Sequence, residues 1–268
     1  MKKSFVLWMM ALGLAAVACN LPGQMVERSV TDVPEIPTEV PTIMPPMPLL
    51  SEKVTILSEP FSETGDKPIY TINAQIPYAQ GPDPARLANF NTLLKKTADD
   101  QIQSFRDSVL TLAPVEPINV GSSFNLQYSV VRQVQDYWSL KYEVDAYFDG
   151  AAHPGHYSAT LNYDLASDRL VTLDELFLPG SNYLQVISEY CKAELAKRDI
   201  GFDGFSAGAD PLPENYTHWN LSADGLIITF DEYQVAPYAA GPQVVIIPPS
   251  ALASVMDSQD GILFLFTK

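Results

Sequence analysis

The 268-residue sequence predicts an α+β fold, in which antiparallel β-meander sheets pack with two longer helices and the elements interleave rather than forming regular βαβ units. Two patterns lead to this expectation. Between 124 and 165 apolar residues alternate with polar ones, which is typical of strands with one buried face. In 84–110 and 181–195 the apolar residues instead recur every three or four positions, as on one face of a helix.

The N-terminus has the three regions of a secretory signal. Lys2 and Lys3 precede an apolar stretch from Phe5 to Ala18, and small residues lead into Cys19. The ending resembles the bacterial lipobox, with Ala16 where leucine is commoner. It predicts a signal peptide over 1–18 and lipidation of Cys19 with palmitate-type chains. The alternatives are an ordinary cleaved signal or a short membrane anchor, although the stretch rises only about 21 Å as a helix against a hydrocarbon core of about 30 Å.

Residues 19–52 predict a tether between the lipidated cysteine and the folded part. The segment is rich in proline, which removes backbone donors and disfavours both helix and sheet. The prolines are Pro22, Pro34, Pro37, Pro41, Pro45, Pro46 and Pro48. At about 3 Å per residue, an extended stalk of this kind holds a domain several tens of ångströms from the bilayer.

The charge balance is strongly acidic, with 32 Asp and Glu against 16 Lys and Arg and a net charge of −16. Nucleic acid is not an expected partner, because phosphate binding requires Lys and Arg patches. An acidic surface attracts a cationic partner by long-range steering, and its simpler interpretation is solubility. Once Cys19 is lipidated, Cys191 is the remaining cysteine, so no intramolecular disulfide is expected and the core has to stabilise the fold.

The folded part is expected to begin near Lys53. Residues 69–76 alternate as a strand. Asp83 then supplies an N-cap and Pro84 the first helical position, so a helix is predicted over 84–110.

The meander is predicted from three apolar rows, within 124–130, 138–148 and 157–165. Gln135 and Asp136 form the expected first turn, and 149–156 forms the second connection. The opposite face of each strand is polar, so we expect it to face water.

The C-terminal half mixes shorter elements. Thr172 and Glu175 have the spacing of a capping box, and Ser181 is expected to cap a second helix that buries Cys191 as a structural thiol. A last short helix is expected to start at 248–250. Four more strands are expected, at 217–221, 226–230, 243–247 and 262–266.

Three stretches carry a family resemblance: 147–154 (YFDGAAHP) with 162–165, 173–177 (LDELF), and 230–241 (FDEYQVAPYAAG) leading into 245–248. Together they resemble the bacterial family DUF3298, preceded by a DUF4163-like region. The resemblance implies a DUF4163-like region over 53–155 and a DUF3298-like region over 156–268, joined in one compact unit.

Members of this family are exported or membrane-anchored. The resemblance includes the extracellular, lysozyme-binding domain of an anti-sigma factor, and a relative in which the module accompanies a polysaccharide deacetylase. For this chain we expect neither a cytoplasmic segment nor an appended deacetylase domain. The resemblance then implies a binding module with an open choice of ligand.

A metal site is one interpretation of His153 and His156, with Asp149 nearby. Such a site needs a third ligand and supporting contacts, and neither an HExxH helix nor a cysteine pair is present. The alternative is that His153 forms a hydrogen bond within the turn that Pro154 shapes. We therefore expect no metal and no cofactor.

Catalytic signatures are equally sparse. No GxSxG elbow occurs, and adjacent acids such as Asp231 and Glu232 on a strand point to opposite faces. Asp174 and Glu175 suit the first turn of a helix through its dipole. We expect no catalytic residues. Convergence of His153, His156 and an acid in one pocket would favour an enzyme.

The stretch from Tyr233 to Gly241 is the clearest candidate for a binding loop, because Pro237 and Gly241 imply an irregular crossing with Tyr233 and Tyr238 beside it. Aromatic side chains on a constrained loop suit sugar stacking or a protein contact. The alternative is that both rings anchor the loop on the core and their hydroxyls bond to backbone. Candidate ligand-binding residues are Asp149, His153, Tyr233 and Tyr238.

These patterns predict a non-catalytic binding lipoprotein of the bacterial cell envelope. It would be anchored in the outer membrane leaflet through Cys19, at the cell surface or in the periplasm. Its expected partner is a cationic protein such as lysozyme. The alternatives are a peptidoglycan-binding or deacetylase-accessory module that binds cell-wall glycan, and an uncharacterised hydrolase.

Overall fold

The computed structural model describes residues 53–111 and 120–256, all of them within one compact unit. The expected signal peptide, Cys19, the stalk and the strand at 262–266 lie outside the described residues. Among the described residues, no helix has the length and apolar character needed to cross a membrane.

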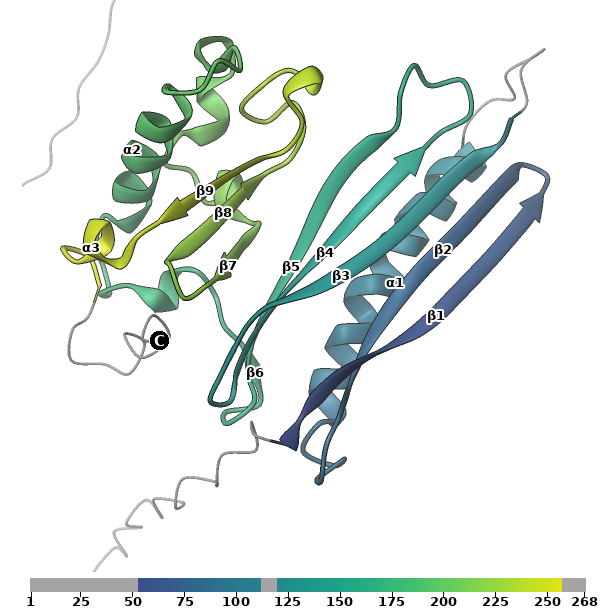
Figure 1. Ribbon diagram of the computed structural model, residues 1–268, viewed down its shortest axis with the longest axis horizontal. Helices are drawn as coiled ribbons and strands as arrows, with labels where there is room; N and C mark the ends of the chain where they lie inside the picture. The colour runs from purple at the N-terminus through teal and green to yellow at the C-terminus, as the bar shows by residue number, and fades with distance from the viewer. Residues whose placement is uncertain (1–52, 112–119, 257–268) are drawn as a thin grey trace, which may run out of the picture. The chain divides into compact units, whose positions relative to one another are not determined.

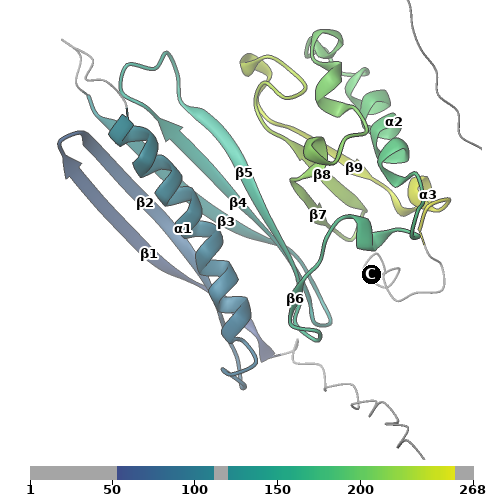
Figure 2. The ribbon, with the colours of Figure 1, turned by 180° about the vertical axis from the view of Figure 1, so that it is seen from behind.

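A six-stranded sheet forms the first layer, and helix α1 (Ala88–Thr111) lies across one of its faces (Figures 1 and 2). Its strands, in spatial as well as chain order, are β1 (Thr55–Asp66), β2 (Ile69–Gln80), β3 (Ser122–Val134), β4 (Tyr137–Tyr147), β5 (Gly155–Asp164) and β6 (Arg169–Leu170). The expected meander is confirmed for β3, β4 and β5, which pair antiparallel.

Two features of this sheet differ from the expectation. Strand β1 was not predicted, because its side chains are mostly exposed and show no apolar alternation. Strands β2 and β3 pair in parallel, with α1 as the crossover between them, so the fold contains one βαβ unit. A parallel neighbour requires such a crossover, whereas the other pairs in the sheet are antiparallel. The α+β class is confirmed.

Helix α1 buries one apolar stripe against the sheet. The stripe consists of Phe90, Leu94, Ala98, Ile102, Phe105 and Val109. The ring of Phe90 stacks on Tyr163 at 4.7 Å, and the hydroxyl of Tyr142 donates to the carbonyl of Leu94 at 2.9 Å. The helix begins at Ala88 rather than at 84, because Asp83 accepts a bond from the Arg86 amide in a turn that precedes it.

The second layer is a three-stranded antiparallel sheet of β7 (Trp219–Leu221), β8 (Leu226–Phe230) and β9 (Gln243–Ile247). Helices α2 (Tyr183–Leu195) and α3 (Pro249–Leu252) pack with it around a second hydrophobic core. Cys191 is fully buried there, as expected. Ser181 does not cap α2, because the N-cap position is Asn182 and Ser181 lies one residue too early to reach the free amides of the first turn.

Short 3₁₀ turns connect these elements. They are η2 (Asp174–Leu176), η3 (Phe202–Gly204), η4 (Ser206–Ala209), η5 (Pro213–Tyr216) and η6 (Tyr238–Ala240). The expected capping box is half present: Glu175 accepts a bond from the Thr172 amide at 2.7 Å, whereas no side-chain cap starts η2.

A buried polar network joins the two sheets. Asn162 on β5 accepts bonds from Ser139 and Tyr137 and donates to the carbonyl of Trp219 at 2.9 Å. Asn220 on β7 donates to Ser139 at 2.8 Å. Because buried polar groups require partners, this network fixes how β7 lies against β4 and β5.

Candidate functional site

A cleft of about 680 Å³ lies between the polar face of β3–β5 and the β8–β9 loop, defined as Asp231–Pro242. This volume is in the range of sites that hold small molecules. The sheet contributes Asn125, Gln127, Lys141, Glu143, Val144, Asp145, His156, Tyr157 and Ser158, and the loop contributes Glu232 and residues 238–242.

Strand alternation supplies the polar wall of the cleft. Because Leu140 and Tyr142 point toward α1, their neighbours Lys141, Glu143 and Asp145 point to the other face. This face was expected to be solvated. The structure corrects that expectation in part: Ser139 is buried beneath β7, whereas Glu143 keeps 60% of its side chain exposed.

His156 joins the two walls of the cleft. Its Nδ1 atom lies 2.6 Å from Oε1 of Glu232, and its Nε2 atom lies 2.8 Å from Oδ2 of Asp145. The backbone amide of His156 also donates to Oε2 of Glu232 at 3.0 Å. The hydrogen bond that the ring donates to Glu232, together with the charges of Glu232 and Asp145, raises the pKa of His156 against the opposing effect of burial. The imidazolium is therefore stabilised between two carboxylates.

His153 holds the aromatic part of the loop. Its ring stacks on Tyr238 with centroids 3.5 Å apart, and its Nε2 atom lies 3.2 Å from the hydroxyl of Tyr233. The Nδ1 atom lies 2.9 Å from the carbonyl of Pro154, which confirms the expected bond within the turn. A carbonyl only accepts, so Nδ1 donates to Pro154.

The two tyrosines do not anchor the loop on a hydrophobic core. Tyr233 is 56% exposed with a positive φ of 66°, and Tyr238 is half-buried. Their ring contacts are with His153, with each other at 6.0 Å between centroids, and, for Tyr238, with His156. The core-anchor alternative is therefore wrong, and both side chains remain available at the rim of the loop.

Asp149 is not among the residues that line the cleft. Its Oδ1 atom accepts a bond from the Val120 amide at 3.3 Å, and its own amide donates to Ser122 at 3.0 Å. Asp149 thus ties the β4–β5 connection to the start of β3. Within the described ranges, no three His, Cys, Asp or Glu side chains are grouped in a way that would hold a metal ion.

All three histidines of the chain contact the β8–β9 loop. His218 completes the set, because its Nδ1 atom lies 3.1 Å from Oδ2 of Asp231. The sequence indicated His153, Tyr233 and Tyr238 but not Asp145, Glu232 or His218. His156 and Glu232 are 76 positions apart, and no spacing rule relates residues at that distance. The sequence showed only that Asp145 lies on the polar face of a strand and that Glu232 belongs to the loop motif.

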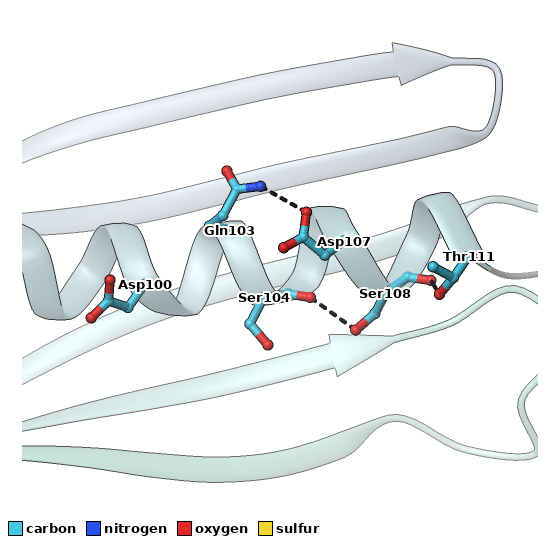
Figure 3. Close-up of a pocket in the computed structure, with 6 residues that line it drawn as sticks. All are labelled: Asp100, Gln103, Ser104, Asp107, Ser108 and Thr111. Atoms are coloured by element: carbon cyan, nitrogen blue, oxygen red, sulfur yellow. Dashed lines mark hydrogen bonds between the residues drawn. The ribbon is translucent and has the colours of Figure 1, made fainter.

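The outer surface of α1 holds a second hollow, of about 510 Å³, lined by polar side chains (Figure 3). Its hydrogen bonds stay within the helix: Gln103 donates to Asp107, and Ser108 donates to the Ser104 carbonyl. The labelled side chains spread along the helix and do not point toward a common centre. This surface is a solvated helix face, and the cleft at His156 is the better candidate.

The chemistry of the cleft suits recognition. His156 lines the cleft with Asp145 and Glu232, whereas His153 stacks on Tyr238 and is not one of the lining residues, so the two histidines and an acid do not all meet in one pocket. In addition, both ring nitrogens of His156 are engaged by carboxylates, so neither has a lone pair directed at a nucleophile. Ser158 lines the cleft two residues away, and no contact joins it to the His156 ring.

The fold and the cleft together define an α+β protein with a polar cleft between a sheet face and an aromatic loop. Residues 174–250, which include β7–β9 and this loop, match the family described as "Protein of unknown function (DUF3298)". The resemblance to DUF3298 seen in the sequence is therefore confirmed for residues 174–250. The DUF4163-like region and the likeness to an anti-sigma factor stay predictions.

Two solved structures share the fold. A DUF3298 family member from Bacteroides fragilis superposes with a TM-score of 0.58 at 17% identity, covering 76% of this chain and 94% of that one. A DUF3298 family protein from Pseudomonas aeruginosa PAO1 gives a TM-score of 0.55 at 16% identity, covering 83% and 99%. At these identities the likeness establishes the fold alone.

Three curated relatives are similar in sequence. The peptidoglycan-N-acetylmuramic acid deacetylase PdaC of Bacillus subtilis is 26% identical over 63% of this chain, and this chain spans about a third (36%) of its length. Immunogenic protein MPT64 of Mycobacterium tuberculosis is 28% identical over 70% of this chain and 79% of its own. Esterase Rv3036c of the same species is 34% identical over 38% of this chain and 45% of its own.

Proposed function

We propose that this protein is a non-catalytic binding module of the bacterial cell envelope, and that its cleft binds a cell-wall glycan. The observation that carries the proposal is the pairing of two kinds of wall. A row of amide and carboxylate side chains on the sheet faces the half-buried Tyr238 on the loop.

A sugar ring presents hydroxyls at its edge and C–H groups on its faces. Asn125 and Gln127 offer both donors and acceptors, and Glu143 and Asp145 offer acceptors, so the sheet wall matches the ring edge. The Tyr238 ring suits the apolar ring face. The similarity to a relative named as a peptidoglycan deacetylase supports a cell-wall ligand, although this chain spans only part of that enzyme.

The binding role rather than catalysis is supported by His156, whose two nitrogens are occupied. The relatives named deacetylase and esterase align over part of their length, and their activities belong to those proteins. In this proposal Cys19 is lipidated and tethers the domain to the membrane through the proline-rich stalk.

The test is retention on purified peptidoglycan sacculi, followed by calorimetry with a soluble N-acetylglucosamine oligomer. We expect the Tyr238→Ala variant and the Asn125→Ala/Gln127→Ala double variant to lose roughly tenfold or more in affinity, as truncation of a central contact does. The matched control is Asn73→Ala, an exposed asparagine on β2 that is not part of the cleft. Absence of retention by the sacculi, or equal loss in the control, contradicts the proposal.

A cationic protein such as lysozyme is the second candidate. The observation in its favour is the net charge of −16, together with the exposed carboxylates of Glu143 and Asp145 at the cleft. Long-range attraction of this kind weakens as salt screens it. We expect a complex with lysozyme that forms at low salt and weakens as salt is added. Absence of binding at low salt excludes this candidate.

A further inference from the structure

We propose that the β8–β9 loop is fastened to the six-stranded sheet by a proton-dependent clamp, in which His156 joins Asp145 of β4 to Glu232 of the loop. The clamp regulates the site of the proposed function, because the same loop carries Tyr238. Its closed form at low pH presents the aromatic wall to the ligand, and its release at high pH frees that wall.

Geometry is the first argument. Glu232 is 7% exposed at its side chain, and each of its oxygens receives a bond from His156, one from the ring and one from the backbone amide. Asp145 receives the other ring nitrogen. The neutral imidazole has one N–H, so it can donate to one of these carboxylates but not to both. Both contacts at once require the protonated ring.

The surroundings of His156 favour the charged form. Glu232 faces it from the loop and Asp145 from β4, and the Tyr238 ring lies 6.4 Å away. Lys141 and Glu143 line the same cleft, where they pair with each other at 3.0 Å, so the cation of Lys141 is already balanced. These contacts raise the pKa of His156 above its ordinary value of 6.5. The clamp is therefore complete at pH values below 6.5, and it is lost as the pH rises through the higher pKa that His156 has in the folded protein.

The middle of the loop is held by contacts that involve no titratable group. The amide of Gln234 donates to the carbonyls of Gly208 at 3.0 Å and Asn215 at 2.9 Å. Val235 and Ala236 are buried. The middle of the loop therefore stays attached to the second layer at any pH, and the clamp controls the parts that face the cleft. Pre-organising that wall increases affinity by reducing the ordering cost of binding.

Hydrogen–deuterium exchange of the full chain, corrected for intrinsic exchange rates, measures the clamp without any ligand. We compare the peptide spanning Asp231–Gly241 at about pH 6, below the ordinary pKa of histidine, and at about pH 9, well above it. We expect exchange of this peptide to increase at the higher pH, by up to about tenfold for each unit by which loop closure raises the pKa of His156. A peptide from α1 serves as the internal reference.

Two variants test whether His156 and its partner Glu232 cause the pH dependence. His156→Gln should exchange quickly at both pH values and show no pH dependence, and Glu232→Gln should behave in the same way with the imidazole still present. The matched control is His218→Gln, which removes the histidine that contacts Asp231 of the same loop. This control should retain the pH dependence. Near-ultraviolet circular dichroism establishes that each variant is folded.

Equal protection of the loop at both pH values in the unmodified chain overturns the proposal. The proposal is also overturned if exchange of the loop still depends on pH in His156→Gln, or if this dependence is lost in His218→Gln but not in His156→Gln. Failure of the glycan proposal gives a different pattern: the protein is not retained on sacculi, but hydrogen–deuterium exchange of the loop still depends on pH. With the N-acetylglucosamine oligomer as ligand, affinity should fall between about pH 6 and about pH 9 in the unmodified chain and stay constant in His156→Gln.

Discussion

Asn220 of β7 donates a hydrogen bond of 2.8 Å to the hydroxyl of Ser139 on β4, and both side chains are completely buried. The same hydroxyl accepts the amide of Leu221 and donates to Asn162 at 2.7 Å. One serine thus satisfies polar groups from both sheets. The position of the loop above the cleft depends on this junction, because β7 and β8 belong to the same small sheet.

Replacing Ser139 by alanine should destabilise the fold by about 1–3 kcal/mol, because it leaves buried donors of Asn220 and Leu221 without their acceptor. Urea unfolding measures this difference. The control is Ser58→Ala on β1, whose exposed hydroxyl bonds to Gln75, and this change should stay within about 0.5 kcal/mol. Similar effects in the two variants contradict a structural role for the junction.

Gly208 determines where the β8–β9 loop lies. A Cβ atom there would stand 1.8 Å from the carbonyl oxygen of Gln234, so Gly208→Ala must displace the loop. We expect lower stability and weaker retention on sacculi, because Tyr238 moves with the loop. Gly204→Ala is the matched control, since no atom lies within 4 Å of its added methyl. Unchanged exchange of the loop in Gly208→Ala would contradict this account.

The ion pair between Arg106 of α1 and Glu63 of β1 holds the edge strand to the helix. The hydrogen bond from Arg106 lowers the pKa of Glu63, against the opposing effect of burial. The ion pair therefore adds to the stability of the fold at pH values above the ordinary pKa of a glutamate. This stabilisation is lost as the pH falls through the lower pKa that Glu63 has in the folded protein. Arg106→Gln should cost about 0.5–1.5 kcal/mol at neutral pH, and the cost should vanish in acid.

Unfolding by urea at a series of pH values tests the Arg106 prediction. The control is Lys95→Gln, which breaks the exposed pair with Asp99 four residues later in α1 and should cost about 0.3–0.5 kcal/mol. A cost for Arg106→Gln that persists unchanged in acid would show that packing of its side chain over Phe61, rather than the charge pair, is what the variant loses.

Cys191 should be chemically inert in the folded protein. Burial raises the pKa of its thiol to about 12, and the side chain is fully covered in the second core. In a Cys19→Ser chain, where Cys191 is the remaining thiol, a thiol-reactive dye should label it only after denaturant is added. Rapid labelling without denaturant would contradict this prediction.

Local pattern was a good guide wherever an element buries one face. The alternating row of β4 and the helical stripe of α1 were predicted because the period of the apolar residues reports the backbone geometry directly. Strand β1 escaped prediction since it lies at a sheet edge with mostly exposed side chains. The start of α2 was misplaced because a serine near a helix end does not by itself show which residue is the N-cap.

The candidate site was predicted in part. His153, Tyr233 and Tyr238 stood out in the sequence, and the structure brings them into contact. The contact between Asp145 and His156 could not be predicted, because a polar residue on a strand indicates only that its face of the sheet lies outside the hydrophobic core. Its partner Glu232 lies on another element and meets it only through His156.

The sequence by itself determined the fold class, the strands of the meander and the region that matches DUF3298, because each of these depends on neighbouring residues along the chain. Tertiary structure alone decided that β2 and β3 are parallel, that the polar face of β4 becomes a cleft wall, and that all three histidines meet one loop. The physical reason is that long-range pairings are selected by the packing of whole layers and leave no periodic trace in the sequence.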